Sequence, residues 1–384
     1  MKIIRLVLLF VCIVLLSGCW DKKELNEVAV VIGVGIDKVS ENEGVYEITA
    51  QVIKPQEDDQ QGAELPTWSV TAQGETIMDA IKNLNRLSPR RLYWSHLQII
   101  IFSEGLAREG VAPIITWFER DRDSRAGSYV VVTRGSAQDL LNQKIELGSI
   151  PAKAMSDLLD SAEQRQIIAR KVKLRDFTTV LTTPGIDPSL DVIQPKNIRG
   201  QVEAYELNDV AIFKDDQLVG YIGGTIMAGT ELLKDTYDYF VVEGVCPGNE
   251  EGFFSFQSTD YESDDELTLK DEELTYKLDI FVEGNLSDQT CPADLLEPDR
   301  MEQVEKEIGE VITSRIENEF EHAKEMGSDI YGIGQKLRRA YPDAWKTAQD
   351  QPDEMLEKVT FDIQVEANIR RSGLIIEPTQ TEIE

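Results

Sequence analysis

Histidine is almost absent from this chain. Only His96 and His322 occur among 384 residues, although histidine is the usual general base near neutral pH. The two lie far apart in the sequence, and no serine or cysteine motif of the nucleophile-elbow type accompanies them. Cys-x-x-Cys, His-Glu-x-x-His and calcium-loop spacings are also missing. The sequence therefore predicts no enzyme activity and no metal or cofactor, and we interpret His96 as a structural residue.

Long hydrophobic runs are missing as well. The apolar run Leu6–Leu16 has eleven residues, whereas a helix that crosses a membrane needs about 20. Lys2 and Arg5 precede the run, and small residues lead from it to Cys19, which is the pattern of a bacterial lipoprotein signal. We expect residues 1–18 to be removed and Cys19 to carry acyl chains, two or more of which hold a protein firmly on a membrane. The alternative is an ordinary secretory signal with an incidental cysteine.

Cysteine is scarce, with four residues in the chain. Cys12 leaves with the signal and Cys19 is the predicted lipidation site, so Cys246 and Cys291 remain. Two cysteines outside the cytoplasm often pair, but free cysteine is also commonly buried. The sequence therefore allows two interpretations: a disulfide between Cys246 and Cys291, or two buried free thiols.

Basic residues are few relative to acidic ones. Lys and Arg total 39 and Asp and Glu total 70, which gives a formal net charge of −31. A surface so negative repels nucleic acid and anionic lipid headgroups, which excludes both as expected partners. Fourteen acidic residues lie between Glu243 and Asp288. We interpret them as the solvated face of a sheet rather than as a cation site.

The first half of the chain alternates between predicted strands and helices, the pattern of an α/β region. Val28–Asp37 and Val45–Lys54 predict a hairpin of two strands. Glu75–Leu87 predicts an amphipathic helix, and Tyr93–Phe102 predicts a third apolar strand. We therefore expect a mixed sheet with flanking helices here.

A dense group of prolines and glycines between Thr182 and Gly200 predicts a linker or domain boundary. It divides the mature chain into an N-terminal α/β region over residues 19–195, with room for two subdomains, and a C-terminal α+β domain over residues 201–375. Residues 376–384 are expected to form a flexible tail.

Two periodic patterns occupy the last third of the chain. Apolar residues recur at three- and four-residue spacing from Met301 to Phe320, which predicts a long amphipathic helix. Val359–Arg370 alternates strictly between apolar and polar residues, as does Tyr276–Val282. We expect these two strands to share an antiparallel sheet under the long helix.

Arginines and acids alternate in the segment Glu119–Arg125. One interpretation is a surface ion-pair network, which contributes little to stability. The other is a docking patch for a partner protein, formed by Arg120, Asp121, Arg122 and Arg125.

Several ordered blocks together resemble one protein family. Gly18–Asn26 reads Gly-Cys-Trp-Asp-Lys-Lys-Glu-Leu-Asn and leads into Val31–Asp37; later blocks are Trp94–His96, Asp329–Gly334 and Tyr341–Trp345. They resemble the C subunits of the nutrient germinant receptors of spore-forming Gram-positive bacteria, the Ger(x)C family of lipoproteins. Such blocks span the mature chain almost end to end.

This resemblance implies an α/β fold of three mixed-sheet domains with flanking helices and no enzyme activity. It implies a subunit of a receptor that triggers spore germination, held by lipid on the outer face of the cell or spore inner membrane. The implied partners are two polytopic membrane subunits, one with a large soluble domain and one similar to transporters. The alternatives are a substrate-binding lipoprotein of a nutrient importer and an exported hydrolase.

Overall fold

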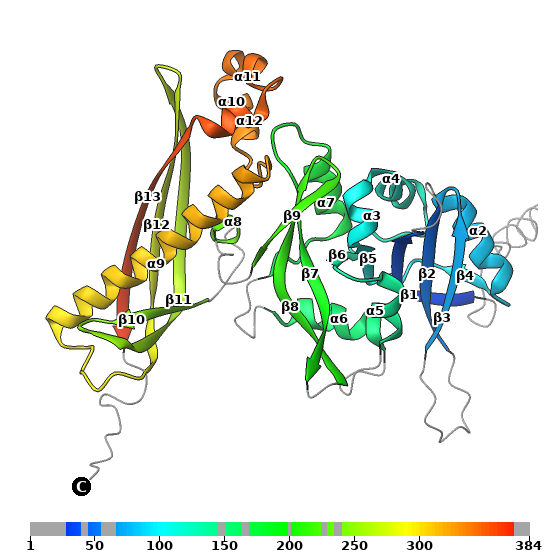
Figure 1. The fold of residues 1–384 in the computed structure, drawn as a ribbon, viewed down its shortest axis with the longest axis horizontal. Coiled ribbons are helices and arrows are strands. Elements are labelled where there is room, and N and C mark those ends of the chain that lie inside the picture. Colours follow the sequence, from blue (N-terminus) through cyan, green and yellow to red (C-terminus); the bar gives the residue numbers. More distant parts are fainter. Residues whose placement is uncertain are drawn as a thin grey trace, which may run out of the picture.

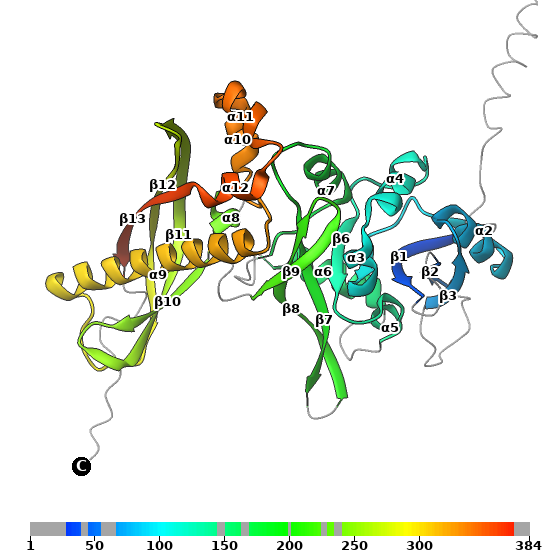
Figure 2. The ribbon, with the colours of Figure 1, turned by 45° about the horizontal axis from the view of Figure 1, so that its top comes forward.

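The computed structural model describes residues 28–39, 45–54, 67–143, 150–162, 169–198, 201–223, 229–233 and 240–371. These residues form two mixed sheets flanked by helices, which confirms the expected α+β class (Figure 1). The described residues contain two sheets where three mixed-sheet domains were expected. The two sheets lie side by side along the long axis of the molecule (Figures 1 and 2). The signal at residues 1–18, Cys19 and the tail at residues 376–384 fall outside the described residues.

The larger sheet combines parallel strands in its middle with antiparallel strands at both ends. The predicted first hairpin is present, with Ile36 opposite Ile48. The strand order is β3, β2, β1, β5, β6, β7, β8 and β9, and β4 pairs with β1 beside this row. Their bounds are β1 Val28–Lys38, β2 Tyr46–Ile53, β3 Thr67–Gly74, β4 Arg91–Tyr93, β5 Ile99–Ser103, β6 Tyr129–Thr133, β7 Ser189–Ile198, β8 Gln201–Lys214 and β9 Gln217–Gly223.

Helices cover both faces of this sheet, so its central strands are buried on both sides. In β5, Ile100 and Phe102 pack into one core, whereas Ile99 and Ile101 pack into the other. This explains why β5 is continuously apolar rather than alternating. The first core includes residues of α2 Ile77–Leu87, α3 Glu104–Glu109, α4 Ala112–Arg120 and α7 Leu174–Leu181, and the second includes residues of α5 Ala137–Asn142 and α6 Pro151–Asp160.

The segment predicted as a linker contains a strand. Strand β7 pairs with β8 along its length but meets β6 at a single position, Val192 opposite Val132. Pro195 therefore lies where β7 has one neighbour, and proline, which cannot donate a backbone hydrogen bond, is tolerated there. The predicted division between residues 195 and 201 runs from the end of β7 to the start of β8, and these two strands pair within one sheet.

The smaller sheet has the order β10, β11, β12 and β13. As predicted, the alternating strands at Tyr276–Val282 and Val359–Arg370 share one sheet. They are neighbours in it, and they run parallel rather than antiparallel. The helices between β12 and β13 carry the chain back along the sheet, and such a crossover produces a parallel pair. The strands are β10 Val241–Cys246, β11 Asn249–Lys270, β12 Glu273–Gln289 and β13 Val359–Arg371.

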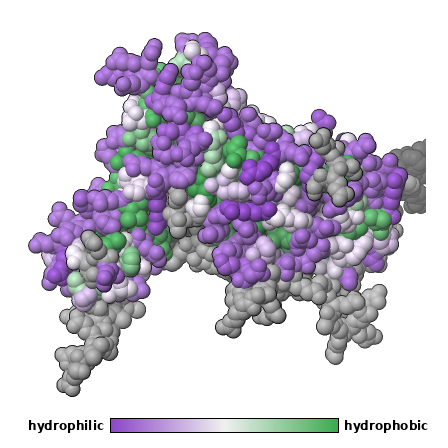
Figure 3. All heavy atoms as spheres, viewed as in Figure 1, coloured by the Kyte–Doolittle hydropathy of each residue, from purple (hydrophilic) through white to green (hydrophobic). Residues whose placement is uncertain are grey.

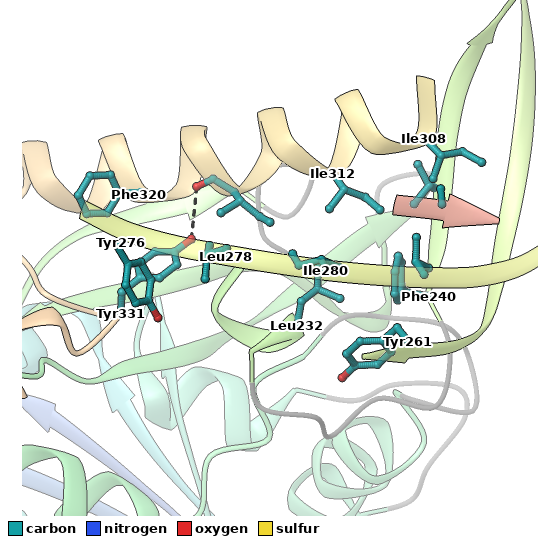
Figure 4. Packing of buried hydrophobic residues seen from close by; sticks show 14 of the residues in the cluster. Leu232, Phe240, Tyr261, Tyr276, Leu278, Ile280, Ile308, Ile312, Phe320 and Tyr331 are labelled. Atoms are coloured by element: carbon teal, nitrogen blue, oxygen red, sulfur yellow. Dashed lines mark hydrogen bonds between the residues drawn. The ribbon is translucent and has the colours of Figure 1, made fainter. Parts of the chain in front are cut away.

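The predicted amphipathic helix is α9 Pro298–Glu325, which lies across one face of the smaller sheet (Figures 1 and 4). Ile308, Ile312 and Phe320 on its buried side pack in one core with Tyr276 of β12. Along β11 and β12, acidic residues alternate with the buried residues of the same strands. The charge between Glu243 and Asp288 therefore belongs largely to the face of the sheet opposite α9. The remaining helices are α8 Gly229–Leu232, α10 Ile333–Ala340, α11 Pro342–Ala348 and α12 Pro352–Glu357.

The face of the molecule seen in Figure 3 is largely polar. Hydrophilic residues cover most of the face seen in Figure 3, and hydrophobic residues show there as separate patches. Each helix within the described residues is either too short or too polar to cross a bilayer.

Candidate functional site

The predicted docking patch begins at the C-terminal end of α4. Arg120 is the last residue of the helix, Arg122 and Arg125 follow in the loop, and all three are exposed. Asp121 is half-buried and accepts a hydrogen bond from the Ser124 hydroxyl at 2.9 Å. Within the described residues, none of the three arginines has an acidic partner at ion-pair distance. Acids and arginines alternate in sequence, but they do not neutralise one another in space.

Asp123, the other acid inside the patch, faces a different arginine. Its carboxylate lies 3.4 Å from the Arg91 guanidinium. This contact joins the loop after α4 to β4, 32 residues earlier in the chain. The segment Glu119–Arg125 is therefore not a self-contained ion-pair network, and the docking patch remains our prediction for Arg120, Asp121, Arg122 and Arg125.

The patch lies where the chain enters the fold. Strand β4 runs parallel to the start of β1, with Val28 opposite Arg91. Val28 follows the predicted lipidation site Cys19 by nine residues, which span at most about 30 Å when extended. A lipid at Cys19 would hold this end of the molecule near the membrane.

The two histidines do not form a reactive group. His96 is exposed next to β4, with its ring centroid 6.1 Å from that of Tyr93. His322 Nδ1 lies 2.7 Å from the Asn318 carbonyl oxygen on α9. In the part of the chain that the structure describes, no three potential metal ligands of the His, Cys, Asp and Glu types come together. Trp94, beside His96, is buried with its ring edge-on to Trp117 at 5.9 Å.

A buried ionic cluster joins the two sheets, and sequence reasoning missed it. Arg170 precedes α7, Glu231 belongs to α8 and Glu319 to α9, and their side chains are 1%, 3% and 0% exposed. The Arg170 guanidinium lies 3.0 Å from Glu231 and 2.6 Å from Glu319. Two further residues bind Glu319: Thr230 Oγ1 at 3.0 Å, which Arg170 also contacts, and the Tyr331 hydroxyl at 3.2 Å. The Arg170 side chain thus connects the segment before α7 to Glu231, 61 residues later in the sequence, and to Glu319, 149 residues later.

A third carboxylate lies near this cluster. Asp191 in β7 accepts hydrogen bonds from the backbone N–H groups of Arg170 and Lys171, both at 2.8 Å. Burial raises the pKa of Asp191 to about 6, although those two N–H groups and the Arg170 charge act in the opposite direction. Asp191 thereby holds the backbone of Arg170 in place while Glu231 and Glu319 hold its side chain. The only signal for the cluster in the sequence is Glu319, a charged residue on the otherwise apolar stripe of α9.

Another buried carboxylate, outside this cluster, holds the turn before α10. Asp329 accepts hydrogen bonds from the backbone N–H groups of Ile333 at 2.9 Å and Gly334 at 2.7 Å. Asp187, before β7, accepts one from the backbone N–H of Asp329 at 2.8 Å. Gly332, in the turn between Asp329 and Ile333, has φ +68°, a backbone conformation that favours glycine. The block Asp329–Gly334 is therefore a structural corner that ties α10 to the larger sheet.

The charge state of Asp329 should make stability depend on pH. Burial raises its pKa to about 7 from an ordinary 3.8, helped by the nearby negative charge of Asp187 and opposed by the N–H groups of its turn. Between about pH 4 and pH 7 the folded chain therefore keeps a proton that the unfolded chain has released, so this residue adds stability as the pH falls. We expect the free energy of unfolding of the native chain, minus that of Asp329→Asn, to grow from pH 7 towards pH 4. Parallel curves would contradict this; the control is Asp343→Asn, whose carboxylate is 96% exposed.

The cysteines predicted as a pair or as free thiols lie together. Cys246 ends β10 and Cys291 follows β12, and both are buried. The structure joins them in a disulfide with Cα atoms 6.5 Å apart. The bond would close the small sheet at the end where the chain enters α9.

Comparison with known proteins gives matches over nearly the whole chain. Residues 21–195 match a family model described as the spore germination protein N-terminal domain, and residues 208–373 match one described as spore germination B3/GerAC like, C-terminal. Spore germination protein KC of Bacillus subtilis (strain 168) is 24% identical, covering 97% of this chain and 96% of that protein. Spore germination protein A3 of the same organism is 25% identical, covering 96% of this chain and 98% of that protein.

The fold has a match among solved structures. The crystal structure of the GerBC protein superimposes with a TM-score of 0.53 and covers 88% of this chain and 96% of that one. The two sequences are 16% identical, so this match concerns the fold.

Proposed function

The chain belongs to the GerAC-like family of spore germination proteins, and we propose that it is the lipid-anchored, noncatalytic subunit of a nutrient germinant receptor. Its partners in this proposal are two polytopic membrane subunits, one with a large soluble domain and one transporter-like. Family membership supports a germinant receptor role rather than that of a nutrient importer's binding lipoprotein. The proposed location is the outer face of the cell or spore inner membrane.

The observation that carries the proposal is the position of the unpaired arginines. Arg120, Arg122 and Arg125 are exposed, and Asp123 between them contacts Arg91, which lies opposite Val28 at the start of β1. An acyl anchor at Cys19 would hold this part of the fold against the bilayer, where a membrane-embedded partner can reach it. The lack of a reactive histidine site among the described residues supports a role in binding rather than in catalysis.

We also propose two parts for the mature chain, residues 19–195 and residues 201–375. The limits of the two family models, 195 and 208, support a division at this point. Strands β7 and β8 pair across this division, and the buried cluster around Arg170 also bridges it, so we expect the two parts to move together when the receptor responds.

Deletion of this chain tests its function. Spores that lack this chain, and whose other germinant receptors are also deleted, should lose germination in response to nutrients. Restoring the gene should restore the response. Unchanged nutrient germination in the deletion would refute the proposal.

The anchor is tested by Cys19→Ala. Without the thiol no acyl chain can be attached, so we expect the chain to leave the membrane fraction after a high-salt wash, whereas the native chain stays. Cys12→Ala, which changes the other cysteine of the N-terminal segment, is the matched control and should leave retention intact. Retention of the Cys19→Ala chain would contradict lipid anchoring.

A further inference from the structure

The charge of this acidic molecule is distributed unevenly along the sequence. Residues 67–135 contain nine Lys and Arg against seven Asp and Glu, whereas residues 240–371 contain 13 against 33. The first of these segments includes α2 and α4, which lie in the part of the molecule away from the smaller sheet (Figures 1 and 2). The net charge of the whole chain therefore conceals one nearly balanced segment, residues 67–135, and one strongly acidic segment, residues 240–371.

After the first turn of α2, which contains Asp79, the exposed side of the helix and the following loop carry cations without acids. Met78, Lys82 and Arg86 follow one another at four-residue spacing, so they form a stripe along the helix. No acidic residue occurs between Asp79 and Glu104, a stretch that also contains Arg90. Lys82, Arg86 and Arg90 have no ion-pair partner within the described residues.

Apolar side chains accompany these cations. Met78 is 63% exposed and Leu87 is 58% exposed, the two highest values for large hydrophobic residues in the part of the chain that the structure describes. Leu87 ends α2 directly after Arg86. The apolar face of α2 packs into the core of the larger sheet, so Met78 and Leu87 are its large apolar residues that can enter the boundary below lipid headgroups.

We propose that the outer side of α2, with Met78, Lys82, Arg86, Leu87 and Arg90, contacts anionic phospholipid headgroups. This inference rests on the proposed anchor, because Cys19 lies nine residues before the strand that pairs with β4. Anionic headgroups supply the charge that Lys82, Arg86 and Arg90 lack, and the shallow apolar boundary below them accommodates Met78 and Leu87. The acidic small sheet would then point away from the negative membrane.

The same argument separates α2 from the docking patch. Glu119, Asp121 and Asp123 lie among the arginines after α4, and a mixture of charges suits a protein partner better than a uniformly negative lipid surface. The α2 surface has no such acids after its first turn. The two surfaces are adjacent, so the lipid contact would turn Arg120, Arg122 and Arg125 towards partners embedded in the same membrane.

The test places a polarity-sensitive fluorophore at Met78→Cys of the full lipidated chain, reconstituted in pure lipid vesicles. The chain without this substitution is the labelling control. With about one third phosphatidylglycerol, the label should shift to the blue and be protected from an aqueous quencher; in pure phosphatidylcholine it should stay accessible. Each cation near an anionic surface raises the equilibrium constant for membrane contact about fivefold. The variant Lys82→Gln/Arg86→Gln/Arg90→Gln should therefore lower the ratio of chains with α2 on the membrane to chains with α2 in solvent about a hundredfold. Salt at 1 M should also abolish protection.

The charge-matched control is Arg338→Gln/Arg339→Gln/Lys346→Gln on α10 and α11, away from α2, which should keep protection. Equal accessibility in both lipids, or protection that survives the α2 charge variant, would overturn the proposal. Protection in spore membranes but not in anionic vesicles would also overturn it, in favour of a protein partner. Because the vesicles contain no other receptor subunit, these outcomes are independent of the germination role, and loss of the chain from the vesicles would instead contradict the anchor.

Discussion

Replacing Arg170 by leucine should lower the free energy of unfolding by about 3–5 kcal/mol. The substitution leaves Glu231 and Glu319 buried next to each other without the cation that both contact. Removing one partner of a buried ion pair is far more costly than breaking an exposed pair, because the remaining charge has lost its solvation as well as its partner. The measurement is chemical denaturation of the purified chain.

The matched control for this variant is Arg175→Leu. Arg175 is 66% exposed and lies 3.2 Å from Asp176, so its loss should cost at most about 1 kcal/mol. A second variant, Arg170→Leu/Glu231→Leu/Glu319→Leu, removes all three charges and should recover much of the lost stability. Equal, small effects of Arg170→Leu and Arg175→Leu would show that the cluster does not stabilise the junction.

Loss of the proposed disulfide should also be severe, at about 4 kcal/mol. The bond joins residues 45 positions apart, and in the chain-entropy model a cross-link over a loop of this length stabilises by about that amount, because it restricts the unfolded chain. Cys246→Ser/Cys291→Ser should therefore unfold at a much lower denaturant concentration than the native chain.

A reducing agent provides the control, since native chain and double variant should then unfold at similar denaturant concentrations. Thiol titration gives an independent result: the denatured, unreduced mature chain should show no free thiol. Two free thiols per chain would favour buried cysteines instead of the bond.

The elements that could be predicted from sequence are those with an uninterrupted period. Helix α9 shows apolar three- and four-residue spacing from Met301 to Phe320, and β13 alternates from Val359 to Arg370. Each buries one side against the other, so the pattern determines both the type of element and the side that packs.

Strand direction and strand β7 could not be predicted in this way. Alternation shows which face of β12 and β13 is buried but is the same for either direction, and the crossover through α9–α12 makes the pair parallel. Pro195 marks β7 as a break in sequence, yet a strand with one neighbour there accommodates it. Both outcomes depend on which strands become neighbours in three dimensions.

The functional surfaces depend on three-dimensional neighbours even more. Arg170 has no local feature that predicts partners 61 and 149 residues away. From the net charge of −31, the sequence analysis predicted that anionic lipid is not a partner. Such a sum over the chain does not show where each charge lies. Our lipid proposal for α2 differs from that expectation for this reason. Arg120–Arg125 was identifiable because its arginines are close together in sequence.

The central claim is that this chain works as a subunit of a membrane receptor. Affinity purification of the full chain from detergent-extracted spore membranes, followed by quantitative mass spectrometry, tests it most directly. We predict that two polytopic membrane proteins, one with a large soluble domain and one transporter-like, copurify in near-constant ratio with the native chain. Both should be depleted with Arg120→Gln/Arg122→Gln/Arg125→Gln and retained with Arg338→Gln/Arg339→Gln/Lys346→Gln. Purification of the native chain without either membrane protein would contradict the account.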